Sequence, residues 1–208
     1  AQKFDSPSID IPQAVRKGCF FHFTQCLWRK VQEFGLQNYY EDREIKTVVR
    51  SIMALAHVPL NRLDEAWMEI DAESPSSDHP AYGALEAFKE YVITNWLENP
   101  TKFPRHLWNH YANFGTRTTN HLEGWHRALK DAVGRSHEDL FKFNSNLKRQ
   151  EKKFRKTMLQ LWMGEKPPRL RKKYVEFNEK LVRFTAELES DEISLIRYIH
   201  RVAFIVPV

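Results

Sequence analysis

Apolar residues recur every three or four positions in segment after segment of this chain, and that spacing limits the folds it can form. Side chains spaced in this way share one face of an α-helix, which can then pack against other helices. With only 7 glycines in 208 residues, the chain favours a helical fold over a sandwich or a barrel. We therefore predict a mainly α structure. The segments with this spacing are residues 24–36, 42–58, 61–73, 85–97, 137–162 and about 170–201.

One segment, "IPQAVRKGCFFHF" at residues 11–23, departs from the helical pattern. A short apolar run surrounds Gly18, which indicates a buried strand. We expect at most one short strand pair near residues 15–21, followed by a helix with Thr24 as its N-cap and Gly35 at its C-terminal end. A lone strand is not stable in water, so other strands or the helical body must cover it. An uncovered strand edge would favour a homodimer.

The positive charge of the chain is concentrated in one region. The net charge is +5, and residues 142–183 contain 14 lysines and arginines against 4 aspartates and glutamates, a local excess of 10. Such a basic stripe is typical of a protein that binds nucleic acid through its phosphates. A solvated helix face would show the same composition, and both interpretations remain open.

Cysteine usage and hydropathy limit the compartment. Cys19 and Cys26 are the only cysteines, too few for a disulfide framework, which favours a reduced compartment, nuclear or cytoplasmic. The start "AQKFDSPSID" lacks the charged and apolar regions of a signal peptide, and it also lacks Met, as expected of a fragment. The apolar run at residues 202–206 is too short to span a bilayer. We expect a protein that is neither secreted nor bound to a membrane.

A motif at residues 117–130, "RTTNHLEGWHRALK", places one acid among Asn, His, Trp and Arg. Glu123 could close a capping box with Asn120 as the N-cap. It could pair with Arg127, four residues later on the same helix face. In a third interpretation, Glu123 binds a divalent metal from the first turn of a helix, where the positive end of the helix dipole favours an ionised carboxylate. The apolar stripe that would anchor this helix consists of Leu122, Leu129, Ala132 and Val133.

A second motif, "GCFFH", contains a Cys-x-x-His pair, Cys19 and His22. A structural zinc site would need two more ligands, for which His121 and His126 are the candidates. Five residues along a helix correspond to about 500°, so these two side chains would diverge by about 140°. We therefore expect that zinc does not bind at Cys19 and His22. The alternative is a buried cysteine and a hydrogen-bonded histidine that help to fold the turn.

Together these motifs resemble the C-terminal half of the catalytic region of a Mutator-like element (MULE) transposase. The resemblance lies in "KGCFFHFTQCLWRKVQEFGL", followed about a hundred residues later by "FPRHLWNHYANFGTRTTNHLEGWHRALK", and it covers residues 11–150. It implies an RNase H-like core in which two aspartates and one glutamate hold two Mg²⁺ or Mn²⁺ ions. Cys19 and His22 match the family signature, and Glu123 matches the catalytic, metal-binding glutamate. Other residues would support the glutamate helix: Asn120, His121, Trp125, His126 and Arg127.

The resemblance also implies a division of the chain. Residues 1–36 would be the last strand and helix of the core, and residues 37–115 would be a helical insertion. Residues 116–162 would hold the glutamate helix and a closing helix, and residues 163–208 would form a basic helical C-terminal segment. The second aspartate of the family would lie at or before residue 1, and the first is absent. One glutamate cannot hold two metal ions, so we expect no bound cofactor and no DNA cleavage by this chain without its missing N-terminal half.

Three functions follow as hypotheses. The first is a fragment or domesticated relic of a MULE transposase that binds DNA, mostly through nonspecific phosphate contacts. The second is a non-catalytic helical module that binds nucleic acid or protein, and the third is a helical domain without a nucleic-acid role. The residues expected to contact phosphates are Lys148, Arg149, Lys152, Lys153, Arg155, Lys156, Arg169, Arg171, Lys172 and Lys173.

Overall fold

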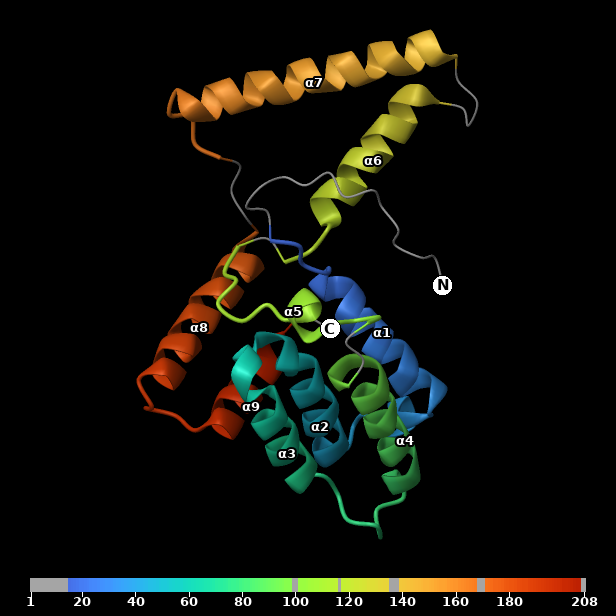
Figure 1. The fold of residues 1–208 in the computed structure, drawn as a ribbon, viewed down its shortest axis with the longest axis vertical. Coiled ribbons are helices and arrows are strands. Elements are labelled where there is room, and N and C mark those ends of the chain that lie inside the picture. The colour runs from blue at the N-terminus through green and yellow to red at the C-terminus, as the bar shows by residue number, and fades with distance from the viewer. Residues whose placement is uncertain (1–14, 99–100, 116, 135–138, 168–170, 207–208) are drawn as a thin grey trace.

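A computed structural model describes residues 15–98, 101–115, 117–134, 139–167 and 171–206. These residues form nine α-helices and no strand, so the predicted mainly α fold is confirmed (Figure 1). The helices are α1 (Phe20–Glu33), α2 (Arg43–Ala54), α3 (Leu63–Ala72), α4 (Tyr82–Val92), α5 (Arg105–Trp108), α6 (Asn120–Val133), α7 (Leu140–Trp162), α8 (Lys172–Glu189) and α9 (Leu195–Ile205). Short 3₁₀ turns, η1 (Leu36–Tyr39), η2 (Leu55–His57) and η3 (Leu60–Arg62), and the π-helical η4 (Ile93–Leu97) lie between them.

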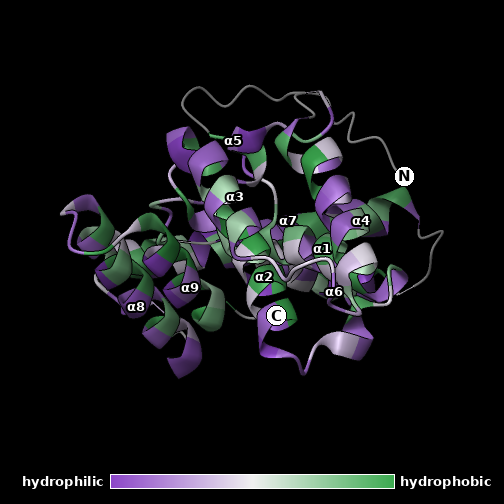
Figure 2. Ribbon diagram, turned by 90° about the horizontal axis from the view of Figure 1, so that it is seen from below, coloured by the Kyte–Doolittle hydropathy of each residue, from purple (hydrophilic) through white to green (hydrophobic). Residues whose placement is uncertain are grey.

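Helices α1 to α4, α8 and α9 build one helical body around a shared apolar core. Each carries hydrophobic residues on one side and hydrophilic residues on the other (Figure 2). Helix α9 lies along α2, although about 150 residues separate them in the sequence, and α8 packs beside α9. The C-terminal helices therefore complete the core that the first half of the chain begins.

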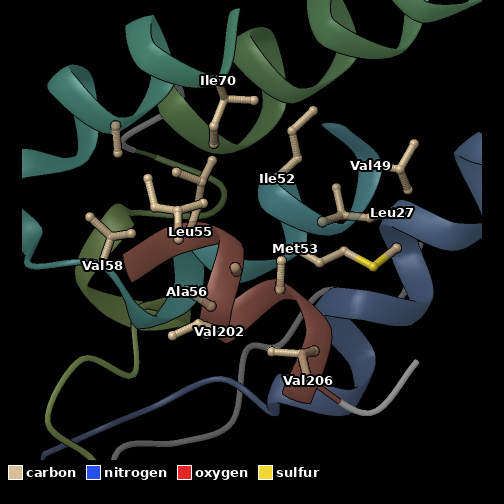
Figure 3. Close-up of a cluster of buried hydrophobic side chains, with 14 of the residues drawn as sticks. Leu27, Val49, Ile52, Met53, Leu55, Ala56, Val58, Ile70, Val202 and Val206 are labelled. Atoms are coloured by element: carbon tan, nitrogen blue, oxygen red, sulfur yellow. The ribbon is translucent and has the colours of Figure 1, made fainter. Parts of the chain in front are cut away.

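The centre of the core lies where α2 meets α1 and α9. Leu27, Ile52, Met53 and Val202 are fully buried there, within the cluster of apolar side chains drawn in Figure 3. Arg50 ties the two helices together at the edge, because its guanidinium donates to the carbonyl oxygens of the last turn of α9 and of the residue that follows it, at 2.8 and 2.9 Å. Burial of this apolar surface is the main stabilising contribution to the fold.

Helices α6 and α7 form an arm that stands away from this body (Figure 1). Among the described residues, neither helix contributes a side chain to the core cluster, and α7 has no buried residue along its 23 positions. No helix in the described ranges is both long and apolar enough to cross a membrane.

The predicted strand near residues 15–21 is wrong. Residues 15–19 have no regular structure, and Phe20 and Phe21 begin α1. No strand lies beside this segment in the described part of the chain. Instead, its amides bond to carbonyls of α5 and of the segment before α6: Gly18 N donates to Leu107 O at 2.7 Å, and Phe20 N donates to Arg117 O at 2.8 Å. These bonds hold the segment, and they leave Phe20 buried but Val15 and Phe21 exposed. Because no strand forms among the described residues, the unpaired strand edge that favoured a homodimer does not exist here.

The helix boundaries also differ from the pattern in places. Thr24 is not an N-cap, because α1 starts four residues earlier and the Thr24 hydroxyl donates within the helix to Phe21 O. Gly35 follows the C-terminal end of α1 in the left-handed conformation, with φ 77°, as predicted. Helix α7 ends at Trp162, before Pro167. Gly164, between these two residues, adopts φ 95°.

Candidate functional site

The two motifs, a hundred residues apart in the sequence, meet at the base of the arm. Lys17 donates from Nζ to the carbonyl oxygens of His106 and Asn109, at 2.9 and 2.8 Å, and so caps the short helix α5. Together with the amide bonds of Gly18 and Phe20, these contacts fix residues 17–20 against residues 106–117. The start of α1 is therefore positioned by the segment that leads into α6.

Gly18 lies close to α5. A Cβ atom built on Gly18 would lie 3.4 Å from Leu107 O, at the short end of ordinary van der Waals contact. The next residue, Cys19, is extended, with φ −77° and ψ 121°, and is the N-cap of α1 without a side-chain cap bond. Its side chain is therefore free to point toward the second motif rather than back at its own helix.

Cys19 reaches the N-terminus of α6. The Cys19 Sγ atom accepts a hydrogen bond of 3.3 Å from Thr119 N. Thr119 is the N-cap of α6, and its hydroxyl donates to Glu123 Oε1 at 3.4 Å. Glu123 N donates to Thr119 O at 3.0 Å. One threonine thus links the cysteine of the first motif to the glutamate of the second.

His22 lies beside the same carboxylate. It is three residues after Cys19 on α1, and the 3.6-residue turn of the helix brings both side chains to one side. His22 Nε2 is 3.7 Å from Glu123 Oε1, and about half of each side chain is exposed, 53% in both cases. The three residues singled out from the sequence, Cys19, His22 and Glu123, are therefore brought together around Thr119, at the surface.

Two sequence interpretations of Glu123 need correction. The capping box with Asn120 is wrong in its register, because Thr119 is the N-cap and Asn120 is the first residue of α6. The ion pair with Arg127 is also wrong: among the described residues, Glu123 pairs with His22 and not with Arg127. The carboxylate lies between Thr119, at the start of its own helix, and His22 of α1, which explains why it does not pair with Arg127 one turn later.

The remaining residues of the glutamate helix are mostly solvent-exposed. Leu122 is 57% exposed, so the apolar stripe expected to anchor α6 does not hold at this position. Trp125 is half-buried, and its ring lies 5.1 Å from that of His126. Asn120, His126 and Arg127 are exposed, and the side chain of His121 lies outside the described part of the structure. The N-terminus of α6 is held by its contacts with Cys19 and His22, whereas the later turns of α6 pack against α7.

Arg117 anchors the second motif to the body, which the sequence did not indicate. Its guanidinium stacks 4.6 Å over the ring of Phe177 and donates to Asn178 Oδ1 at 2.5 Å and to Asn113 O at 2.7 Å. Burial lowers the pKa of Arg117 to about 10, so it remains charged at neutral pH. The peptide unit that holds the start of α1 is thereby fixed to α8.

Two buried histidines, His57 and His110, lie beneath the site, and nothing in the sequence indicated their role. His110 Nε2 donates to Gly18 O at 2.9 Å, and its Nδ1 accepts from the Asn113 amide at 3.1 Å, which fits a neutral ring with the proton on Nε2. Burial lowers the pKa of His110 to about 4. His57 is fully buried, and its ring lies 4.8 Å from that of Phe20. Burial, and then the charge of Arg117, lower the pKa of His57 to about 3.

The donor set does not by itself fit a two-metal site. In the described residues, no group of three or more His, Cys, Asp or Glu side chains is placed to hold a metal ion. Glu123 supplies one partly exposed carboxylate, and two-metal chemistry needs several. The expectation that zinc does not bind at Cys19 and His22 stays a prediction.

The residues expected to contact phosphates lie on two elements. Along α7, all of these residues are exposed in the described structure. Leu147 is half-buried on another side of the helix: at 100° per residue, each α7 cation lies at least about 80° around the helix from it. Arg171, Lys172 and Lys173 are exposed at the start of α8, whereas Arg169 lies outside the described residues. Two of the α7 cations have polar neighbours: Arg155 pairs with Glu151 at 2.8 Å, and Arg149 donates to Asn146. The α7 set consists of Lys148, Arg149, Lys152, Lys153, Arg155 and Lys156.

Comparison of the chain with protein-family models, with curated proteins and with solved structures gives no match.

Proposed function

We propose that this chain is the C-terminal part of the catalytic region of a Mutator-like DDE transposase. The observation that carries the proposal is the meeting of Cys19, His22 and Glu123, from motifs a hundred residues apart, at the base of α6. The order and spacing of the motifs alone do not require this contact, whereas a shared catalytic centre does. Glu123 would contribute one carboxylate, and the two aspartates that complete the site would have to come from sequence N-terminal to these residues.

In the complete enzyme, bound Mg²⁺ or Mn²⁺ would supply the charge that stabilises a reacting phosphate. The residues described here would then position the glutamate. Thr119 orients its carboxylate, Cys19 fixes Thr119, and His22 adds a donor at the same oxygen when it is protonated. Such an enzyme would work in the nucleus, and the two free cysteines fit a reduced compartment.

The exposed cations of α7 support DNA binding as the contribution of this part of the chain. Helix α7 carries seven lysines and arginines and one glutamate, Glu151. If all seven cations contact phosphates, affinity for duplex DNA falls roughly 10³–10⁴-fold between about 50 and about 200 mM salt. Fluorescence anisotropy with a labelled duplex at several salt concentrations measures this slope. A flat salt dependence would show that the basic face does not hold DNA.

Charge reversal on α7 is the matching mutational test. Replacing Lys152, Lys153 and Lys156 with glutamate is expected to weaken DNA binding at least about 100-fold at low salt and to lower the salt slope by about 3, because three phosphate contacts are lost. The control reverses three exposed cations on the body, with the same change in net charge, and leaves binding nearly unchanged. Equal losses in both variants would point to net charge rather than to α7. The control positions are Arg29, Arg43 and Arg197.

A non-catalytic helical module remains the second candidate, because the arm presents its cations without any contribution from Glu123. The two candidates differ in one readout. The first requires Glu123 for cleavage once the aspartates are supplied, whereas the second predicts DNA binding alone.

A further inference from the structure

A groove in the arm lies outside the contact of Cys19, His22 and Glu123. It has a volume of ≈ 500 Å³ and is lined by side chains of α6 and α7, two helices that diverge from one another (Figure 1). Two aromatic rings line it: Trp125 of α6 is half-buried, and Phe154 of α7 is 54% exposed. Pockets of about 300–1,000 Å³ hold one small ligand or group, whereas a protein partner typically covers about 800 Å² on each side. The size of the groove therefore suits a single flat group rather than another helix.

Most of the remaining groups that line the groove are polar. Asn144 and Gln150 carry carboxamides, each of which can donate and accept hydrogen bonds. Lys148 adds a positive charge, and the carboxylate of Glu151 already pairs with Arg155 at 2.8 Å. A ligand that matches these groups together with the two rings has an aromatic face, a polar edge and a negative charge. A nucleotide combines these features.

The positive charge beside the groove continues along α7. Lys148 lines the groove, and Lys152 and Arg155 lie within about 40° of it around the helix, at 100° per residue. Lys148 and Lys152 are exposed. Helix α7 as a whole carries seven lysines and arginines against one glutamate. Charge complementarity therefore selects a polyanion that runs along α7 and places one of its bases in the groove.

We propose that the groove binds an unpaired base of single-stranded DNA. The base stacks against Trp125 and Phe154, its polar edge bonds to the carboxamides, and the phosphates beside it contact Lys148 and Lys152. Stacking of bases on aromatic side chains beside a positively charged track is how proteins hold single strands without reading their sequence. A base within a duplex is stacked between its neighbours and must first be extruded, so an unpaired base enters the groove far more readily.

The proposed transposase function, on which this assignment rests, gives the groove a role. Trp125 follows Glu123 by two residues, so the two side chains lie about 200° apart around α6. They leave opposite sides of the same helical turn, across a helix that is about 10–12 Å wide with its side chains. The unpaired base then belongs to the DNA strand beside the carboxylate to which the proposed function assigns cleavage.

The first test removes the aromatic rings of the groove one at a time. Phe154→Ala is expected to weaken binding of an oligothymidine strand roughly 10-fold or more and to change duplex binding less than about 2-fold, because the groove stacks only unpaired bases. Phe154 is exposed, so this change leaves the fold intact. Trp125→Ala should have the same effect, whereas Trp125→Phe keeps an aromatic ring and should retain most of the affinity. Fluorescence anisotropy with a labelled single strand and a labelled duplex, at the same low salt concentration, measures both affinities.

The matched control is Phe204→Ala. Phe204 is 56% exposed, nearly as much as Phe154, but it lies on α9 of the body. This change should leave single-strand and duplex binding unaltered. A second readout detects stacking directly: the fluorescence of an aminopurine base in the single strand should be quenched on binding to the parent chain, and less so on binding to either alanine variant of the groove.

The outcomes separate the groove from the proposed function. If Phe154→Ala and Trp125→Ala leave single-strand binding unchanged, or weaken single-strand and duplex binding equally, the groove does not hold an unpaired base, whereas duplex binding by the α7 cations stands. A ribonucleotide strand that binds more tightly than the DNA strand would assign the groove to RNA and overturn the proposal. A chain that binds neither single-stranded nor duplex DNA at low salt would overturn both the groove assignment and the DNA binding of the proposed function.

Discussion

Replacing His57 with leucine is expected to make the protein markedly more resistant to acid. His57 is fully buried in η2, and neither ring nitrogen has a hydrogen-bond partner among the described residues. Burial is the main reason that its pKa falls to about 3, and the nearby charge of Arg117 adds to this effect. The folded protein therefore holds this ring neutral over most of the acid range.

The direction of the pH effect follows from the two pKa values. Above pH ~6.5 the ring is neutral in both the folded and the unfolded chain, so His57 adds no pH dependence. Between pH ~6.5 and ~3 the unfolded chain binds a proton that the folded chain does not, so stability falls as pH falls. At about 1.4 kcal/mol per pKa unit, the loss attributable to His57 is at most roughly 3 kcal/mol at pH 4. His110, with a pKa of about 4 in the folded state, adds to it in the same direction.

His57→Leu removes this proton linkage without removing a hydrogen bond of the ring. We expect the free energy of unfolding to change little or rise at pH 7, and to exceed that of the parent chain by a few kcal/mol at pH 4. Urea unfolding at both pH values measures the difference. His106→Gln changes an exposed histidine of α5 and should leave the acid slope unaltered. If His57→Leu keeps the full acid slope of the parent, the buried ring is not the source of that slope.

The helical body could be predicted from the sequence because its helices are amphipathic. Spacings such as that of Leu27 and Val31, or of Val49 and Met53, reflect one buried face per helix, and both pairs are buried. The strand near Gly18 could not be excluded in the same way. A short apolar run is buried whether it forms a strand or the start of a helix, and only the tertiary bonds to Leu107 and Arg117 decide between them.

The residues of the candidate site were found as separate motifs, and their contact was not derivable from spacing. The link depends on Thr119, which bonds Cys19 and Glu123 through its amide and its hydroxyl. A threonine before an asparagine gives no signal that it, and not Asn120, is the N-cap, because both residue types cap well. His57 and Arg117 were missed because a histidine or an arginine in a sequence carries no mark of burial.

Changing Glu123 to glutamine is expected to have the largest functional effect of any single substitution. The side chain is about half exposed, and its Oε1 accepts from the Thr119 hydroxyl. Glutamine keeps an acceptor oxygen at this place and removes the negative charge. In the 208-residue chain the free energy of unfolding should therefore change by less than ~1 kcal/mol, the range of one cap or one surface pair.

When the chain is joined to a segment that supplies the two aspartates, the same substitution is expected to abolish Mg²⁺-dependent strand cleavage, by roughly 1,000-fold or more. The physical reason is that a hard divalent cation needs ionised oxygen ligands, and a neutral amide is a poor substitute. Cleavage of a labelled DNA duplex measures the rate, and anisotropy on the same samples measures DNA binding. Binding should be retained, because the phosphate contacts that we propose come from the α7 cations and not from Glu123.

The matched control is Glu41→Gln, which removes one exposed carboxylate from the body and should leave both cleavage and DNA binding at the parental level. The combination of readouts separates the two candidate functions. Loss of cleavage with unchanged binding and stability assigns Glu123 to the catalytic centre, because neither a cap nor a surface pair affects cleavage alone. Cleavage at the parental rate in the Glu123→Gln protein would instead leave this carboxylate as part of the α1–α6 contact. The contact of Cys19 and His22 with α6 would then be a structural feature of a DNA-binding arm.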